Sequence, residues 1–241
     1  SFDETMPEEF NRIVTDNLSS IFFVTEPSGK ENLLREGKDT DKIFEVGNTM
    51  IDTLVAFESE LDKNTILKKL NLQPHQYILI TMHRPVNVDS KQQLEKLATL
   101  FNVVGKKYKL VFPIHPRTRN HIHEFGLDAM FSNNQNLLLL EPLDYFAFQK
   151  LVKHCKLVLT DSGGIQEETT YRQIPCLTLR PNTERPITVE QGSNELIEYD
   201  EALIIKKIEA IENGTFKKGN VPPLWDGHAS ERIAKVMFEL K

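Results

Sequence analysis

The sequence predicts an α/β protein built on a doubly wound parallel sheet. From Tyr77 onward, five short apolar segments alternate with polar segments of helical period, which is the pattern of repeated strand–helix units. The apolar segments lack polar alternation, and strands that helices cover on both faces have this composition. The predicted strands are residues 77–81, 109–113, 136–140, 156–160 and 175–179.

Helical spacing appears between these strands. Within residues 90–105, apolar side chains recur at positions 94, 97, 98, 101 and 104, which places them on one face of a helix. Asp89 or Ser90 supplies the side chain that caps its first turn. Residues 146–155 and 165–172 are predicted as shorter helices.

The first fifty residues form a separate piece. The expected elements are a helix at 8–18, a strand at 21–24, a helix at 29–36 ended by Gly37, and a strand at 43–46. Two strands and two helices bury little core of their own, so we expect this piece to pack on the main sheet or on an absent partner. After it come a mostly helical connector at 52–72, a loop at 222–227 and a last helix at 229–240.

Composition and charge exclude several classes of partner. With 241 residues, of which 39% are hydrophobic, the chain can bury a sizeable core. A net charge of −6 and a pI near 5.7 argue against a nucleic acid or an anionic membrane as the partner. We expect a cytoplasmic protein, because no apolar run is long enough to cross a bilayer and the first residues are acidic. Cys155 and Cys176 lack the spacing of metal ligands or disulfides and are predicted to be buried thiols.

A turn with two glycines follows the predicted strand at 156–160. Ser162, Gly163 and Gly164 stand between that strand and a helix start, at the sheet edge where ligands bind. Glycines let a ligand approach the backbone, and free amides at a helix N-terminus attract phosphate. These residues are candidate diphosphate contacts, and Glu168, one turn later, is a candidate acceptor for ribose hydroxyls. The alternative is that the turn only caps a helix, and the residues alone do not decide between the two.

Two arginines follow the next strand. Arg180 and Arg185 lie in a loop with two prolines, and guanidinium groups there would suit a phosphate or a carboxylate. Either arginine is a candidate for the diphosphate. The alternative is that they pair with Glu184, Glu190 or another acid of the chain.

Histidines follow two other strands. His83 and His115 should lie at the same rim as the glycine turn, where imidazole can contact phosphate or transfer a proton. A metal site formed by His115, His121 and His123 is disfavoured, because the last two, at i and i+2 on a helix, face apart. We expect neither a metal ion nor a cofactor.

The first predicted helix begins with a capping pattern. Thr5 and Glu8 have the spacing of a capping box, and Pro7 suits a first helical turn. On spacing, Glu8 is therefore structural.

Taken together, these residues resemble the non-hydrolysing branch of the UDP-N-acetylglucosamine 2-epimerase family. The resemblance runs over nearly the whole chain and includes the Thr-Glu-Arg-Pro segment at 183–186, which the hydrolysing branch lacks. Seven blocks carry it, at residues 6–12, 46–49, 81–84, 141–145, 160–168, 183–186 and 223–227.

The resemblance implies a reaction and roles for individual residues. A base removes the proton at C2 of the sugar as UDP leaves C1, and UDP then adds back to the 2-acetamidoglucal with C2 inverted, which converts UDP-GlcNAc to UDP-ManNAc. His83 matches the family's active-site histidine and Glu8 one of its catalytic carboxylates, so the resemblance overrides the local interpretation of Glu8. UDP would be held by Phe148, near the uracil, together with Ser162, Gly163, Gly164, Glu168 and Arg185.

The same resemblance implies the organisation of the chain. The fold would be the C-terminal half of a glycosyltransferase-B-like two-domain fold, with Rossmann-like domains. Its parts would be residues 1–50, a remnant of the first domain; 51–76, a connector; 77–225, the UDP-binding domain; and 226–241, a C-terminal helix. Because the family's active site lies between two domains, we expect this chain to be inactive alone, and the full-length protein to be a homodimer.

The sequence is also compatible with three alternative functions. Close relatives of the family act on a UDP-2,3-diacetamido uronic acid and share these blocks. A non-catalytic nucleotide-binding module is a second alternative. A glycosyltransferase of the same fold is a third, although the Thr-Glu-Arg-Pro segment resembles epimerases more closely.

Overall fold

The structure, a computed structural model, describes residues 7–239, with side chains described from residue 9 onward. The chain divides into two compact units, and Phe57–Val221 form the larger one. The smaller unit combines the chain before Phe57 with the chain after Val221. The sequence predicts boundaries after residues 50, 76 and 225, whereas in the structure the helices that follow residue 57 belong to the larger unit.

The larger unit contains a six-stranded sheet in which every neighbouring pair of strands is parallel. The strand order is β5-β4-β3-β6-β7-β8, which confirms the prediction of a doubly wound parallel sheet. Each predicted apolar segment contains one strand. β8 is an unpredicted sixth strand, because its sequence Asn-Glu-Leu has no apolar run. The strands are β3 (Tyr77–Thr81), β4 (Lys109–Pro113), β5 (Leu137–Leu140), β6 (Leu157–Thr160), β7 (Cys176–Thr178) and β8 (Asn194–Leu196).

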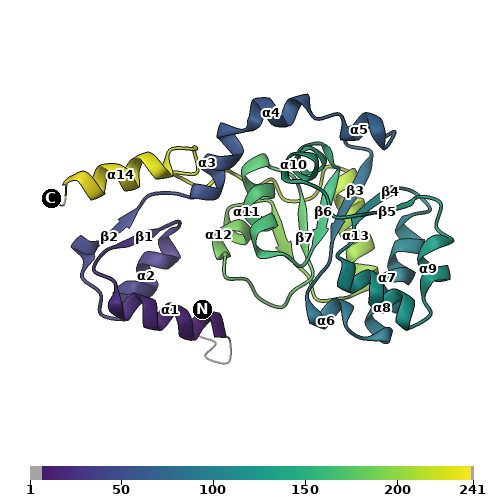
Figure 1. Ribbon diagram of the computed structural model, residues 1–241, viewed down its shortest axis with the longest axis horizontal. Coiled ribbons are helices and arrows are strands. Elements are labelled where there is room, and N and C mark those ends of the chain that lie inside the picture. The colour runs from purple at the N-terminus through teal and green to yellow at the C-terminus, as the bar shows by residue number, and fades with distance from the viewer. Residues whose placement is uncertain (1–6, 240–241) are drawn as a thin grey trace. The chain divides into compact units, whose positions relative to one another are not determined.

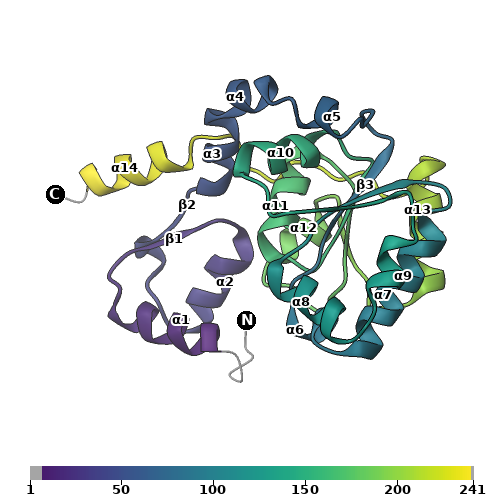
Figure 2. The same ribbon diagram turned by 45° about the vertical axis from the view of Figure 1, so that its right-hand side comes forward.

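Helices cover both faces of this sheet (Figures 1 and 2). α7, α8, α9 and α13 pack on one face, and α5 and α10 on the other. Ser90 caps α7, as predicted, by accepting a hydrogen bond from the amide of Gln93. Within the described residues, every helix is too short or too polar to cross a membrane. The helices of this unit are α4 (Glu58–Lys63), α5 (Ile66–Lys69), α6 (Pro85–Val88), α7 (Lys91–Val104), α8 (Pro116–Glu124), α9 (Asp128–Ser132), α10 (Tyr145–His154), α11 (Gly163–Arg172), α12 (Pro186–Glu190) and α13 (Glu201–Glu212).

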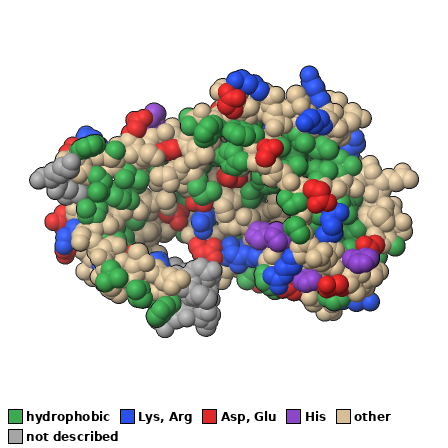
Figure 3. Space-filling model, in the orientation of Figure 1, with side chains coloured by type: hydrophobic (Ala, Val, Ile, Leu, Met, Phe, Trp, Pro, Cys, Tyr) green, Lys and Arg blue, Asp and Glu red, His purple; other side chains and the backbone are tan. Residues whose placement is uncertain are grey.

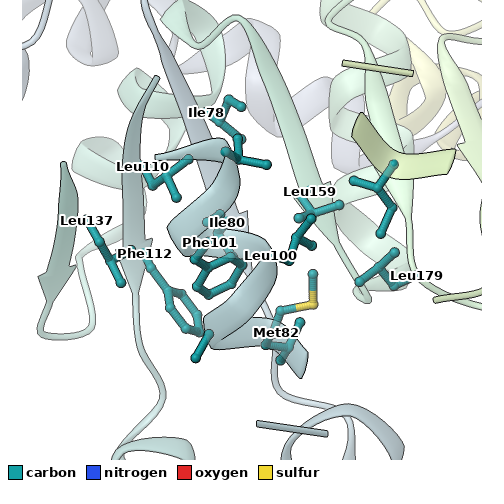
Figure 4. Close-up of a cluster of buried hydrophobic side chains, with 14 of the residues drawn as sticks. Ile78, Ile80, Met82, Leu100, Phe101, Leu110, Phe112, Leu137, Leu159 and Leu179 are labelled. Carbon is teal, nitrogen blue, oxygen red and sulfur yellow. The ribbon is translucent and has the colours of Figure 1, made fainter. Parts of the chain in front are cut away.

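Alternate residues of each central strand enter opposite cores. Along β3, Ile78 and Ile80 face the core under α7, and Tyr77 and Leu79 face the core under α10. Figure 4 shows Ile78 and Ile80 packed with Phe101 of α7 and its neighbours. Burial of each isoleucine or leucine side chain stabilises the folded state by roughly 1.5–3 kcal/mol relative to its exposure to water. These two cores hold the strand ends that carry the candidate site.

The two cysteines are buried free thiols, as predicted. Cys155 follows the last residue of α10, and Cys176 begins β7. Burial raises the pKa of both thiols, that of Cys176 to about 11. Both are therefore protonated near neutral pH and act as small apolar side chains.

The smaller unit has a two-stranded parallel sheet, β1 paired with β2. Its core is a cluster of four buried side chains, Phe22, Val24, Leu33 and Ile43. Both strands and both early helices were predicted within one or two residues. The elements are α1 (Pro7–Leu18), β1 (Phe22–Val24), α2 (Pro27–Arg35), η1 (Thr40–Lys42), β2 (Ile43–Glu45), α3 (Thr49–Ala56) and α14 (Ala229–Glu239).

Within the smaller unit, polar contacts attach the last segment of the chain to the first. The carboxylate of Asp52 accepts from the amides of Ala229 and Ser230 at 3.0 and 2.6 Å. The indole of Trp225 donates to the carbonyl of Thr25 at 3.1 Å. Gly47, at φ +86°, lies so close to the loop at residues 222–227 that a Cβ there would be 2.0 Å from the carbonyl oxygen of Leu224. Two of the family blocks, 46–49 and 223–227, therefore pack on each other.

Candidate functional site

The candidate site lies where the chain changes direction across the sheet. β3 has β4 on one side and β6 on the other, so the loops that leave the carboxyl ends of β3 and β6 diverge. In open α/β sheets, a ligand binds in the crevice at this point. His83 follows β3, and Ser162 follows β6.

A pocket of about 280 Å³ opens at this edge. It brings together four residues that the sequence analysis singled out, namely His83, His115, Phe148 and Ser162. Figure 3 shows histidine and basic side chains close together on one face of the larger unit. The lining residues are Thr81, Met82, His83, Pro113, Ile114, His115, Pro142, Leu143, Phe148, Ser162 and Ile165.

The glycine turn begins helix α11. Gly163 and Gly164 are its first residues, and Ser162 is its N-cap, with extended backbone and no capping hydrogen bond from its side chain. The amide of Ser162 donates to Thr160 Oγ1 at 2.9 Å. The first turn of α11 therefore presents backbone amides and the positive end of the helix dipole.

Arg185 lies over this turn. A Cβ built on Gly163 would lie 3.5 Å from Arg185 Nη1 and 3.7 Å from its Cζ. The guanidinium Nε donates to Glu167 Oε2 at 2.7 Å, and the side chain is about one third exposed. A guanidinium and the amides of a helix start thus converge on one small volume, which suits a phosphate oxygen.

Arg180 also pairs with an acid, and its Nη1 lies 3.9 Å from the Gly163 Cβ position. Its guanidinium is buried and donates twice to Glu184, at 3.0 and 2.7 Å. Burial by itself would raise the pKa of Glu184, but the two hydrogen bonds from Arg180 and the charge of Arg84 lower it to about 2. This pair fixes the loop between β7 and α12, and Arg185 is the more exposed of the two arginines.

His83 is held by a buried aspartate. Asp161, fully buried after β6, accepts from the amides of His83 and Arg84 and from the side chain of Asn87, at 2.9 to 3.2 Å. His83 Nδ1 lies 3.2 Å from Asp161 Oδ1, and half of the imidazole surface is exposed. A histidine whose Nδ1 faces a carboxylate presents Nε2 to a substrate.

The other histidines have structural partners. His115 is the N-cap of α8, and its Nδ1 accepts from the amide of Arg117 at 3.2 Å, although its ring also lines the pocket. His121 Nδ1 lies 3.0 Å from the carbonyl of Val88, and His123 Nδ1 lies 3.3 Å from Asp128. Over residues 7–239, no group of three His, Cys, Asp or Glu side chains is arranged to hold a metal ion.

Glu168 lies on α11, where it faces Gln149 of α10, and is buried. Burial raises its pKa to about 7, against opposing effects of Gln149 and Arg172. Its Oε2 has no hydrogen-bond partner among the described residues, so the carboxyl group retains capacity to accept from a hydroxyl. Phe148, on the facing helix, packs on the core below α10 and also lines the pocket.

Glu8 falls within helix α1. Its side chain lies outside the described residues, and so does Thr5. The catalytic role that the resemblance gives to Glu8 therefore stays a prediction.

Asp161 and Gln166 are two residues of the site that the sequence did not indicate. Both are fully buried polar residues at the site. Their positions beside the glycine turn were visible in the sequence, but their partners come from other segments, 74 to 78 residues away for Asp161 and 17 to 28 for Gln166. The available signal was a run of polar residues at positions where the helix faces the core.

Comparison with known proteins places the chain. The family model described as UDP-N-acetylglucosamine 2-epimerase matches residues 1–238. UDP-N-acetylglucosamine 2-epimerase of Methanocaldococcus jannaschii is 40% identical over 98% of this chain and 66% of its own length. UDP-2,3-diacetamido-2,3-dideoxy-D-glucuronate 2-epimerase of Pseudomonas aeruginosa is 32% identical over the whole chain and 66% of its own length.

Solved structures agree. The UDP-GlcNAc 2-epimerase of M. jannaschii, in complex with UDP-GlcNAc and UDP, superposes with a TM-score of 0.86 at 39% identity, over 99% of this chain and 66% of that one. This likeness confirms the expected Rossmann-like, glycosyltransferase-B-like fold class. The chain spans about two thirds of the length of the relatives that it matches. It belongs to the UDP-N-acetylglucosamine 2-epimerase family.

Proposed function

We propose that this chain is the UDP-binding part of a UDP-N-acetylglucosamine 2-epimerase. The observation that carries the proposal is the convergence of the first turn of α11 and the guanidinium of Arg185, 3.5 Å from the Gly163 Cβ position, at the switch point of the sheet. Since the chain spans about two thirds of its relatives' length, we assign the complete reaction to a protein of the relatives' full length.

The diphosphate would bind at the start of α11. The amides of Gly163 and Gly164 would donate to its oxygens, and Arg185 would add charge-assisted hydrogen bonds. These donors and the positive charge of Arg185 stabilise the negative charge of the departing UDP, which a helix start that serves only as a cap would not need. Charge develops on this leaving group as the bond from C1 to oxygen breaks, so preorganised donors here lower the barrier.

The nucleoside would extend from the diphosphate toward the space between α10 and α11. Glu168 Oε2, unpartnered among the described residues, suits the ribose hydroxyls. Phe148, at the pocket wall, suits the uracil ring.

His83 and Glu8 would carry the proton chemistry at the sugar. Removal of the C2 proton and loss of UDP give a 2-acetamidoglucal, and return of both groups with the opposite stereochemistry at C2 completes the epimerisation. The arrangement of His83 on Asp161 leaves Nε2 for the substrate. The part of Glu8 rests on the resemblance. The sugar would be UDP-GlcNAc or UDP-ManNAc, the assembly a homodimer and the compartment the cytoplasm.

Two measurements test this function. The full-length protein, incubated with UDP-GlcNAc in deuterated water, should incorporate deuterium at C2, and a protein that binds the sugar nucleotide without any exchange would contradict the assignment. Calorimetric titration of this chain with UDP tests the binding role by itself, with CMP and inorganic phosphate as control ligands.

A second candidate keeps the chemistry and changes the sugar. The 32% identity with the epimerase of a diacetamido glucuronate supports it, while the 40% identity with the UDP-N-acetylglucosamine enzyme favours the first. Parallel exchange assays with both UDP-sugars separate the two, since the true substrate should exchange faster at equal concentration.

A further inference from the structure

A buried amide joins the two halves of the proposed diphosphate site. Gln166 lies in α11, one turn after the glycines, and is fully buried. Its Nε2 donates to the carbonyl of Ser162 at 3.1 Å. Its Oε1 accepts from Thr183 Oγ1 at 2.7 Å and from Asn194 Nδ2 at 3.0 Å. One side chain thus contacts the glycine turn, the arginine loop and the edge strand β8.

The link continues to Arg185 through Thr183. The hydroxyl of Thr183 donates to Gln166 and accepts from the backbone amide of Arg185 at 3.0 Å. The hydroxyl of Thr188, itself a hydrogen-bond acceptor from Asn194, donates to the carbonyl of Arg185 at 2.8 Å. The backbone of Arg185 is therefore fixed on both its amide and its carbonyl by groups that meet at Gln166.

The side chain of Arg185 is fixed from the same helix. Its Nε donates to Oε2 of Glu167, the residue after Gln166, at 2.7 Å. A single helix therefore carries the amides of the first turn and, two to four residues later, the groups that set where the guanidinium stands over them.

We propose that Gln166, acting through Thr183, is a positioning residue that sets the span between Arg185 and the amides of Gly163 and Gly164 to the size of a diphosphate. The inference rests on the proposed function, because it concerns the same anion. An exposed ion pair would leave the arginine free to move, and a donor displaced by about 1 Å loses much of its contribution to binding and catalysis. The buried amide supplies the rigidity that such a site needs.

The test cuts the link at Thr183, since replacement of Gln166 would leave several buried polar groups unpaired. Thr183→Val keeps the shape and removes the hydroxyl, and Thr183→Ser keeps the hydroxyl. UDP affinity, measured by calorimetry, should fall roughly 3- to 10-fold in Thr183→Val, the scale of one neutral hydrogen bond. It should be retained in Thr183→Ser, and uridine, which lacks the phosphates, should bind all three proteins equally.

A double-mutant cycle and a control separate positioning from simple loss of stability. Arg185→Ala should cost less UDP affinity in the Thr183→Val background than in the unsubstituted chain. Ser193→Ala removes a buried hydroxyl that donates to the carbonyls of Thr169 and Ile174, so it should lower stability and leave UDP affinity unchanged. Hydrogen exchange at the Arg185 amide should quicken in Thr183→Val but not in Thr183→Ser.

The outcomes distinguish the inference from the function beneath it. Absence of UDP binding by the unsubstituted chain overturns the proposed function and this inference together. If the chain binds UDP and Arg185→Ala weakens that binding, the proposed function stands. In that case, full UDP affinity in Thr183→Val, or an equal loss of affinity for UDP and uridine, overturns only the positioning role of Gln166.

Discussion

Helices α10 and α11 begin at the same edge of the same sheet, after β5 and β6, but their first turns differ. The carboxylate of Asp144 caps α10, accepting from the amide of Ala147 at 2.8 Å. α11 begins with two glycines after Ser162, whose side chain makes no capping bond, and a guanidinium stands over it. A carboxylate of the chain thus meets the positive end of one helix, whereas the other presents its amides beside a cation. An anion site at a helix start therefore depends on the absence of a capping side chain as much as on the presence of a nearby cation.

The largest expected effect is a change in the pH dependence of stability on substitution of Glu168, which lies where α11 faces α10. Its folded pKa of about 7 lies above the ordinary value of 4.5 because of burial. The contribution of this carboxyl group to stability is therefore full below pH 4.5, falls as the pH rises from 4.5 through about 7 and is constant above that, with a total loss of up to about 3 kcal/mol at about 1.4 kcal/mol per pKa unit. Glu168→Gln should abolish this fall in urea unfolding measured from pH 4.5 to 8.

Glu168→Gln should also weaken the binding of UDP. Ribose hydroxyls donate best to an ionised carboxylate, so UDP affinity of the unsubstituted chain should increase as the pH rises through about 7. The variant should bind more weakly, with no such rise. A variant as pH-sensitive in stability as the original would show that another group titrates.

Arg185→Ala removes the cation from the start of α11. UDP affinity should fall by roughly 1.5–3 kcal/mol, the scale of a charge-assisted hydrogen bond, as measured by calorimetry. Arg119→Ala is a matched control, since Arg119 pairs with exposed Glu141 and should leave affinity unchanged. Equal affinity in Arg185→Ala would place the diphosphate elsewhere.

Gly163→Ala tests the space beneath the guanidinium. The new Cβ would stand 3.5 Å from Arg185 Nη1, an ordinary contact, so the fold should tolerate it. The methyl group would nevertheless occupy the volume proposed for phosphate oxygens, and overpacking of this kind costs about 1–3 kcal/mol. We expect weaker UDP binding with an unchanged melting temperature, and unchanged affinity would contradict the site.

A pair of cap substitutions gives the smallest effects. Asp144→Ala should destabilise the protein by about 1 kcal/mol, because it removes a helix cap, without loss of UDP affinity. Ser162→Ala should cost less than about 0.5 kcal/mol of stability, because no capping bond is lost. It should nevertheless lower the affinity for UDP. Thermal unfolding and calorimetry on both variants test this difference, and similar changes in stability and in UDP affinity for the two substitutions would show that the two helix starts have the same role.

The sheet was predictable because its central strands are uninterrupted apolar segments. β3 and β6, buried on both faces, stand out in the sequence for that reason. β8 did not, since an edge strand of three residues needs no apolar run. The short helices α6, α9 and α12 also lacked a sequence signal, because four or five residues define no period.

The site was partly predictable, for a related reason. Glycines, arginines and histidines that follow strand ends can be recognised in the sequence as candidate site residues, because parallel strands bring their carboxyl ends to one edge of the sheet. The sequence could not predict that Arg180 is buried against Glu184 while Arg185 stays about one third exposed, since this depends on how the loop after β7 folds. The network around Gln166 was equally hidden, because its partners on β8 and the arginine loop are distant in sequence.

The most direct test of the central claim is a crystal structure of this chain with UDP. The diphosphate oxygens should lie within hydrogen-bond distance of the amides of Gly163 and Gly164 and of the Arg185 guanidinium. A nucleotide bound elsewhere, or a first turn of α11 packed so closely against the protein that no anion fits, would contradict the account.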